Sequence, residues 1–452
     1  MLKGASRQNH MRDMTKGKPL HTIIAFAIPL TAGSMIQQLF SLADAMILGI
    51  FGGNEGLAIL GTCSWPIWFQ ISVLTAFGQA ACLLAAVRFG AKDEDGFKSA
   101  VGNIYLFSIV TGIVLTLGFQ LLVIPLLKFQ NTPSAVMEEA VQYLRILYGG
   151  TVFLLLYNML ASLLRSVGDS YTSFIAITIS AFLNIALDIV LVAGFHMGVK
   201  GAAIGTMAAQ SAAALICIKK IWRYKEFRIG RKNISFDKSI MKEYVSLCLP
   251  MVTQSLVIAM GGIFVQHCVN RYGVFFAAGI SAAESIFSVV ETGAVALAQA
   301  CATFVSQNVG AKQYLRIQKA VRQACVLAVS AAVGIGGILL LFGPGILTLY
   351  VKGEALQYAV SDMTIISFGL IIMYPMYSLR QTVQALGNLW IPLIAGVLQL
   401  AVRILTAWYL PMLIGYQGLF YTNIAAWLVS ILLIGVIYPA QLKKCQGKEN
   451  NV

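Results

Sequence analysis

Apolar residues run in long blocks along almost the whole chain of 452 residues. Each block has about 20 residues or more, which is the length that an α-helix needs to cross the hydrocarbon core of a membrane. Lipid offers no partner for backbone N–H and C=O groups, so membrane-crossing blocks of this length must be helical. We expect about twelve spans, at 22–51, 57–83, 100–127, 138–163, 172–195, 200–221, 244–270, 276–303, 321–343, 361–386, 391–413 and 418–438.

The composition agrees with lipid as the main solvent. Hydrophobic residues make up 58% of the chain and charged residues 11%, against about 25% charged residues in soluble domains. The polar, basic residues 1–19 and the long first span do not fit a cleavable signal peptide. The eight cysteines form no CxxC pair and mostly fall inside spans, so we expect neither disulfides nor a metal site.

The net charge of +14 is distributed as in a membrane protein and not as in a nucleic-acid binder. With twelve spans, 25 of the 32 lysines and arginines fall on the side that holds both termini and four on the other side, and this bias predicts cytoplasmic termini and an inner-membrane location. The longest polar interruption divides the chain into two sets of six spans. We expect an N-tail at 1–19, an N-lobe at 20–222, a basic linker at 223–242, a C-lobe at 243–440 and a C-tail at 441–452.

The two halves resemble each other at an offset of about 220 residues. Pro29 matches Pro250, the stretch 90–92 (Gly-Ala-Lys) matches 310–312, and Gly168 matches Gly387. We therefore expect an all-α membrane protein with two six-helix lobes related by a pseudo-two-fold axis along the membrane normal. Such duplications are typical of secondary transporters, which place their sites near the repeat interface and move one half against the other.

Five stretches, in this order, resemble the multidrug and toxic compound extrusion (MATE) family, and the resemblance extends from about Leu20 to Tyr438. They are 41–49 in the first span, 165–169 after the fourth, 184–188 in the fifth, 198–206 opening the sixth and 306–312 after the eighth. The resemblance implies an antiporter that exports organic, often cationic, compounds against an inward flow of Na⁺ or H⁺.

Two departures refine the resemblance. Ser173 or its neighbour stands where the family usually has a proline after 165–169. We also expect spans seven and ten to lack the acids that the NorM-type branch uses, with Gln254, Gln266 and Gln384 as the nearest polar groups. The retained first-half pattern resembles the DinF-like branch.

Charged side chains inside a membrane are costly and point to function by default. At a helical rise of about 1.5 Å per residue, Asp44, Asp188 and Thr206 should all lie about 10 Å below the outer boundary. Asn184 shares a helix face with Asp188 because the two are four residues apart. Two carboxylates, an amide and a hydroxyl at one level suit a small cation or a shared proton.

The resemblance implies that the residues matching Asp44, Asn184, Asp188 and Thr206 carry cation coupling. Hydrogen bonding of Asp188 and Asn184 to each other or to nearby backbone is the purely structural alternative. Tyr143 lies at a similar depth and is expected to join this group. Asn158 resembles a residue of the family's cavity, although its expected depth is nearer the cytoplasm.

The second half carries a mixed set of charges inside its spans. Glu284 and Glu291 are seven residues apart on span eight and face one direction, and Arg403 lies at a depth comparable with Glu284. Two interpretations remain open: an internal ion pair between Glu284 and Arg403, or a cavity wall that meets the cargo.

Three other functions compete with an antiporter. A lipid-linked saccharide flippase would want more arginines in the first half, where Arg145 is the main candidate. A membrane enzyme is disfavoured because no HExxH, GxSxG, GxGD or P-loop pattern occurs and the four histidines show no metal spacing. A channel fits the duplication less well than alternating access does. We expect a monomer whose partners are a small organic molecule, a coupling Na⁺ or H⁺ and membrane lipid, with no cofactor and no nucleic acid.

Overall fold

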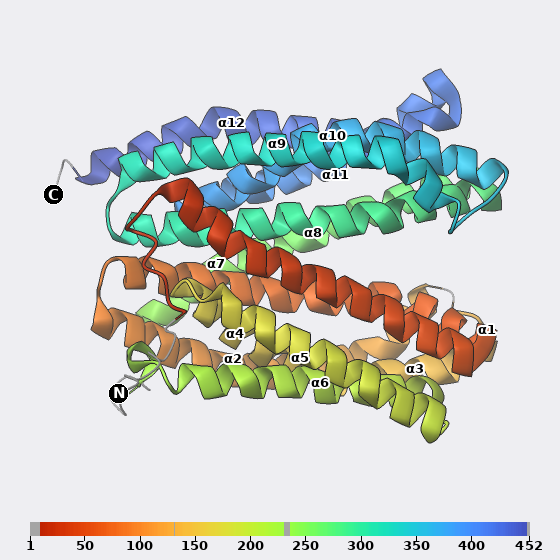
Figure 1. The fold of residues 1–452 in the computed structure, drawn as a ribbon, viewed down its shortest axis with the longest axis horizontal. Helices are drawn as coiled ribbons and strands as arrows, with labels where there is room; N and C mark the ends of the chain where they lie inside the picture. The colour runs from red at the N-terminus through yellow and green to blue at the C-terminus, as the bar shows by residue number, and fades with distance from the viewer. Residues whose placement is uncertain (1–9, 131, 230–235, 450–452) are drawn as a thin grey trace, which may run out of the picture.

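The computed structural model describes residues 10–130, 132–229 and 236–449, which are almost entirely helical. The helices run side by side along the long axis of the molecule (Figure 1). Their bounds are α1 (Pro19–Gly90), α2 (Glu94–Phe129), α3 (Ser134–Gly149), α4 (Thr151–Ser166), α5 (Ser170–Asp188), the π-helix η1 (Ile189–Gly194), α6 (Gly198–Ile221), the short η2 (Lys225–Phe227), α7 (Lys238–Asn270), α8 (Val274–Gly310), α9 (Tyr314–Leu347), α10 (Glu354–Ala385), α11 (Trp390–Ile414), η4 (Gly415–Tyr421) and α12 (Thr422–Glu449).

The helices confirm a polytopic membrane protein with about the expected number of spans. In the described chain, ten segments are long and apolar enough to cross a membrane, or eleven if α3 and α4, bent by 44° about Gly150, form one span. Two of the ten segments, Pro19–Phe51 and Ala58–Gly90, lie within α1. The last segment, Trp390–Gln446, contains α11 and most of α12, which pack against each other. The expectation of about twelve spans in an all-α fold is therefore confirmed.

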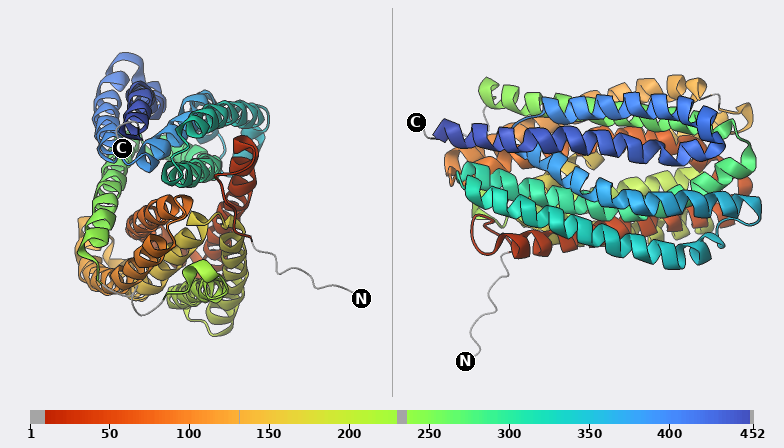
Figure 2. Two further views of the ribbon diagram at one scale, coloured as in Figure 1. Left: turned by 90° about the vertical axis from the view of Figure 1, so that its left-hand side faces the viewer. Right: turned by 90° about the horizontal axis from the view of Figure 1, so that it is seen from above.

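Two groups of helices make up the molecule. Seen along the helices, α2–α6 lie in one group and α8–α12 in the other, with α7 and the first part of α1 on opposite sides between them (Figure 2). The helix α1 packs against α4 and α5 of the first group and against α8 of the second. We call α1 to α6 the N-lobe and α7 to α12 the C-lobe. We call the end where α1 begins and α12 finishes the termini end, and the opposite one the far end (Figure 1).

The repeated Gly-Ala-Lys stretch marks a close approach of the two lobes. A Cβ atom on Gly90, which ends α1, would lie 1.9 Å from the carbonyl oxygen of Gln307. A Cβ on Gly310, which ends α8, would lie 1.8 Å from the carbonyl oxygen of Val87. Backbone therefore meets backbone here in a way that only glycine permits. Lys92 and Lys312 have φ values of 58° and 56°, so the repeat has the same local shape in both lobes.

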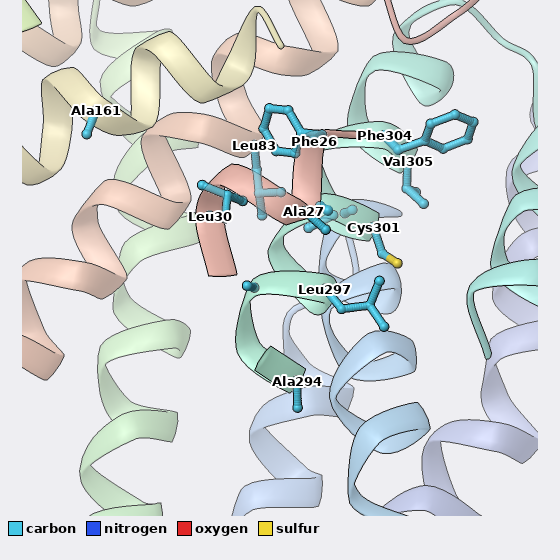
Figure 3. Close-up of a cluster of buried hydrophobic side chains, with 14 of the residues drawn as sticks. Phe26, Ala27, Leu30, Leu83, Ala161, Ala294, Leu297, Cys301, Phe304 and Val305 are labelled. Atoms are coloured by element: carbon cyan, nitrogen blue, oxygen red, sulfur yellow. The ribbon is translucent and has the colours of Figure 1, made fainter. Parts of the chain in front are cut away.

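A hydrophobic core of buried side chains joins the two lobes (Figure 3). Its side chains come from α1 and α4 on one side and from α8 on the other, and burial of their apolar area stabilises this contact. The labelled members are Phe26, Ala27, Leu30, Leu83 and Ala161 of the N-lobe with Ala294, Leu297, Cys301, Phe304 and Val305 of the C-lobe. The lobes are thus closed on each other at the termini end.

The expected tails and linker differ in part from the structure. Residues 10–17 pack between the lobes, and Met14 has no exposed surface. The helix α7 begins at Lys238, six residues before the expected span, and α12 continues to Glu449 through most of the expected C-tail. Residues 1–9, 230–235 and 450–452 of the expected tails and linker lie outside the described residues.

Candidate functional site

Two buried aspartates from different helices meet in the N-lobe. Asp44 lies in the first span of α1, and Asp188 is the last residue of α5. Both side chains are buried, and their carboxyl groups lie within hydrogen-bonding reach of each other. The Oδ1 atom of Asp188 has no hydrogen-bond donor among the described residues. Two carboxylates this close oppose each other's ionisation, so a shared proton or a small cation would stabilise the pair.

An amide and a hydroxyl complete this group. With the Asn184 amide oriented to suit its neighbours, its Nδ2 donates to Oδ2 of Asp188 at 3.2 Å. Its oxygen then accepts from the backbone N–H and the Oγ1 of Thr206, at 3.2 and 3.3 Å. The spacing of four residues between Asn184 and Asp188 places both on one face of α5, opposite α6. We call Asp44, Asn184, Asp188 and Thr206 the aspartate cluster.

The local backbone around Asp188 is irregular. The helix α5 changes there to the π-helix η1, in which Phe195 N donates to Val190 O at 2.9 Å. Such π-helical turns are rare and occur frequently at functional sites. On the facing helix α6, a Cβ atom on Gly205 would lie 2.4 Å from Oδ1 of Asp188. Because Gly205 has no side chain, the Asp188 carboxylate can occupy this space next to α6.

The other two N-lobe candidates have different positions. Tyr143 on α3 is buried and lies close enough to Asp44 and Asp188 to interact electrostatically with both, as expected from its depth. Asn158 on α4 donates to Leu154 O of its own helix at 2.9 Å, and no hydrogen bond of the described structure joins it to the aspartate cluster. The structure thus brings Tyr143 to the cluster and leaves Asn158 outside its hydrogen-bond network.

The ion pair between Glu284 and Arg403, one of the two interpretations that the sequence leaves open, does not form among the described residues. No ion pair within 4.0 Å joins them in the described part of the chain, although each feels the other's charge. Arg403 instead donates from Nη1 to Ile258 O of α7 at 3.2 Å, and its Nε has no partner among the described residues. Gly261 explains this position, because the Arg403 stem lies 3.0 Å from where a Cβ of Gly261 would be.

Glu291 has partners of its own in the C-lobe. The hydroxyl of Tyr377 on α10 donates to Oε1 of Glu291 on α8. The guanidinium of Arg380 lies over the Tyr377 ring at 4.4 Å, a cation–π contact. Glu291 is therefore held by Tyr377, whereas the Glu284 side chain is exposed and makes no hydrogen bond within the described residues.

One buried acid escaped the sequence reasoning. Asp362 lies in α10, inside the expected span ten, and was not among the expected site residues. Its side chain is 5% exposed, and no hydrogen bond or ion pair joins it to the described residues, although it feels the charge of Glu284. A lone Asp in an apolar block was the available signal. Asp362 stands at the second residue of the expected span, where it passes for an interfacial residue.

The glutamines expected near a second-half site form a structural bridge. Gln384 of α10 donates to Oε1 of Gln254 on α7 at 2.8 Å, and Gln254 donates to Pro392 O at 3.0 Å. Gln266 bonds Asn270 of its own helix at 2.9 Å. Among the described residues, no three or more His, Cys, Asp or Glu side chains gather as a metal site would require. These glutamines therefore have structural partners, and the aspartate cluster is the main set of candidate coupling groups.

Comparisons with known proteins identify the family. The MatE family model matches residues 29–190 and 250–409, one stretch in each lobe. A probable multidrug resistance protein of Bacillus subtilis, YoeA, is 26% identical over 457 residues, covering 95% of this chain and 96% of its own length. The probable multidrug resistance protein NorM of Thermotoga maritima is 24% identical over 332 residues, 73% of this chain and 71% of its own.

Solved structures share the fold over nearly the whole chain. One, described as the outward-facing conformation of a multidrug resistance MATE family transporter, has a TM-score of 0.89 at 20% identity and covers 98% of this chain and 100% of its own. A transporter from Pyrococcus furiosus, described as having a binding pocket of reverse polarity, has a TM-score of 0.88 at 20% identity, covering 96% and 98%. The duplicated family match and this shared fold show that the chain belongs to the MatE family, whose members are membrane transporters and not enzymes.

Proposed function

We propose that this protein exports small organic compounds across the inner membrane in exchange for entering H⁺ or Na⁺, and that the aspartate cluster binds the coupling ion. The observation that carries the proposal is the contact between two buried carboxyl groups, Asp44 and Asp188, with an acceptor oxygen that has no donor among the described residues. A buried pair of this kind is stabilised when a cation or proton arrives. Asn184 and Thr206 supply further oxygens for a hard cation such as Na⁺.

Coupling requires that the ion and the cargo favour different conformations. When the aspartate pair is ionised, mutual repulsion favours a state in which water reaches it. When the pair is neutralised, the helices α1 and α5 can pack closely around it. Pro29, inside the first span of α1, lacks the N–H for a helical bond and offers a place for α1 to bend. Repacking of α1 near Pro29 would displace the cargo and release it outward.

The C-lobe charges support a cationic cargo. Glu284, Glu291 and Asp362 are three acids against the two bases Arg380 and Arg403, and Glu284 is exposed and makes no hydrogen bond within the described residues. Tyr377, with Arg380 over its ring, already engages Glu291, so Glu284 and Asp362 remain to attract a positive group, with Arg403 beside Glu284. The complete aspartate cluster of the N-lobe favours membership of the DinF-like branch.

Ion-driven efflux from reconstituted vesicles tests the function. Wild-type protein should export a fluorescent organic cation when an H⁺ or a Na⁺ gradient is imposed. Asp44→Asn keeps the shape and removes one charge, so folding should persist while driven export falls by about 100-fold or more, the loss of a coupling energy of about 3 kcal/mol. Asp188→Asn should behave in the same way.

A matched control separates coupling from general charge effects. Asp95→Asn makes the same chemical change at an exposed acid in the first turn of α2 and should export at the wild-type rate. Wild-type export by correctly folded Asp44→Asn under both gradients would exclude the aspartate cluster as the coupler. Ion-independent movement of a lipid-linked saccharide, without export of the dye, would favour the flippase instead.

The orientation in the membrane follows from the charge distribution. We propose that the termini end faces the cytoplasm, because the basic residues that flank the spans collect there and anionic lipid attracts them. A monomer suffices for this mechanism, since both lobes belong to one chain. Trypsin cleavage after Lys16 in spheroplasts without prior lysis would contradict this orientation.

A further inference from the structure

The described part of the N-terminus does not hang free but lies between the two lobes. Residues 10–17, which we call the N-terminal segment, precede α1 at the termini end. Met14 has no exposed surface, and Thr15 is 9% exposed. A short polar segment before the first span is ordinarily a solvated tail. Burial of this segment calls for a specific set of partners.

The N-lobe holds the beginning of the segment. Arg12 N donates to Val167 O at 3.1 Å, and the ring of His10 lies 4.6 Å from that of Tyr171. Gly168 has a φ of +82°, and a Cβ there would lie 2.3 Å from Arg12 O. Glycine at this position therefore serves both the turn after α4 and the close approach of the segment.

The C-lobe holds the middle of the segment through the end of α8. Met14 N donates to Oε1 of Gln307 at 2.8 Å, and Nδ2 of Asn308 donates to Met14 O at 3.2 Å. Gln307 also donates from Nε2 to Ser166 O of the N-lobe at 2.7 Å. One buried amide thus binds the segment and the opposite lobe together.

Arg316 at the start of α9 completes the docking site. Its guanidinium donates to Met14 O at 3.1 Å and to Lys16 O and Gly17 O at 2.7 Å each. These three bonds are charge-assisted and converge on one turn of backbone. Burial opposes ionisation of Asp13, but hydrogen bonds from Thr15 and the charge of Lys16 hold the pKa of Asp13 below its usual value, so the turn keeps its ionised acid at neutral pH.

We propose that the N-terminal segment is a latch that holds the termini end closed and must leave its site whenever that end opens. The stretches 165–169 and 306–312, which lie away from the aspartate cluster, are its receptor. The segment contacts both lobes, so no rigid movement of one lobe away from the other keeps all its bonds. The bonds of the docked segment therefore favour the conformation in which the termini end is closed. Release of the segment is part of the transport cycle. This inference rests on alternating access but not on the cargo or the coupling ion.

Protease protection tests docking without any transport assay. Cleavage by trypsin after Lys16 needs an extended backbone, whereas Lys16 O is bound by Arg316 in the docked segment. Arg316→Gln removes these charge-assisted bonds and should speed this cleavage by about tenfold. Arg322→Gln makes the same change at an exposed arginine on the same helix and should leave the rate unchanged. Equal rates in Arg316→Gln and wild type would overturn the latch.

Crosslinking tests whether the segment must leave. The double variant Met14→Cys with Asn308→Cys joins two positions in direct contact, and six of the eight native cysteines are buried. Oxidation should stop ion-driven export, and reduction should restore it, while Met14→Cys alone should be insensitive to oxidation. Undiminished export by the crosslinked protein would mean that the segment stays docked throughout. If the reduced double variant exports nothing, the protease rates decide.

Discussion

The position of Asp188 depends on packing as much as on charge. Its carboxylate lies at the change from α5 to η1, and Gly205 of α6 leaves the space that its Oδ1 occupies. Asn184 donates to the other oxygen. A change at Gly205 therefore alters the geometry of the aspartate cluster without removing any of its polar groups.

The first prediction is that Gly205→Ala uncouples transport. The new methyl group would lie 2.4 Å from Oδ1 of Asp188 and would push the carboxylate away from Asp44. We expect a loss of stability of about 1–3 kcal/mol from overpacking and a fall in ion-driven export of at least about tenfold. Gly61→Ala, in a helix with nothing within 4 Å of the new methyl, should be neutral or slightly stabilising. Thermal unfolding and vesicle export check both; normal export by Gly205→Ala would contradict the prediction.

Equal expected depth brought together residues that also meet in the structure, Asp44, Asp188 and Thr206, but it did not predict the partner of Arg403. Asp44, Asp188 and Thr206 are fixed by where each helix enters the membrane, which the charge pattern reveals. Whether Glu284 reaches Arg403 depends instead on a gap at Gly261 that lets the long Arg403 stem turn toward α7. Such a gap exists only in the folded structure, so sequence could not reveal it.

Helix ends carry much of the specific structure at the scale of elements. Asp169 is the N-cap of α5, where it accepts from Thr172 N at 2.9 Å and from the Tyr224 hydroxyl at 2.6 Å. Where the two lobes meet, α1 ends at Gly90 and α8 ends at Gly310. The sequence repeat predicted that these two ends are equivalent. It could not predict that they touch, because contact depends on the conformation.

The second prediction is that Gly310→Ala weakens closure of the termini end. The methyl group would lie 1.8 Å from Val87 O, and backbone can yield only if the ends of α1 and α8 separate. Separation strains the docked N-terminal segment, so trypsin should cleave after Lys16 at least about fivefold faster. Gly334→Ala, with open space around it in α9, is the matched control. Unchanged cleavage together with unchanged melting temperature would show that the lobes close without this contact.

The whole molecule repeats one scaffold with two different sets of charges. The offset of 219 residues that relates Gly168 to Gly387 also relates Asn184 to Arg403 and Tyr143 to Asp362. Two neutral residues at or beside the aspartate cluster, Asn184 and Tyr143, therefore correspond to a base and an acid in the C-lobe. The symmetry of the fold was predictable because repeats preserve glycines and spacing. The different charges of the two lobes were not predictable from the repeat, since they lie at the few positions where the two halves differ.

The last prediction concerns the link between the lobes. If the coupling ion and the cargo favour different conformations, each must weaken the binding of the other by the same factor. Raising H⁺ or Na⁺ should then lower the affinity of purified protein for a fluorescent cation by about 5- to 150-fold, as fluorescence polarisation can measure. In Asp44→Asn the affinity should no longer respond to the ion, whereas in Asp95→Asn it should respond as in wild type. An affinity that is indifferent to both ions in wild-type protein would mean that the aspartate cluster and the cargo site do not communicate.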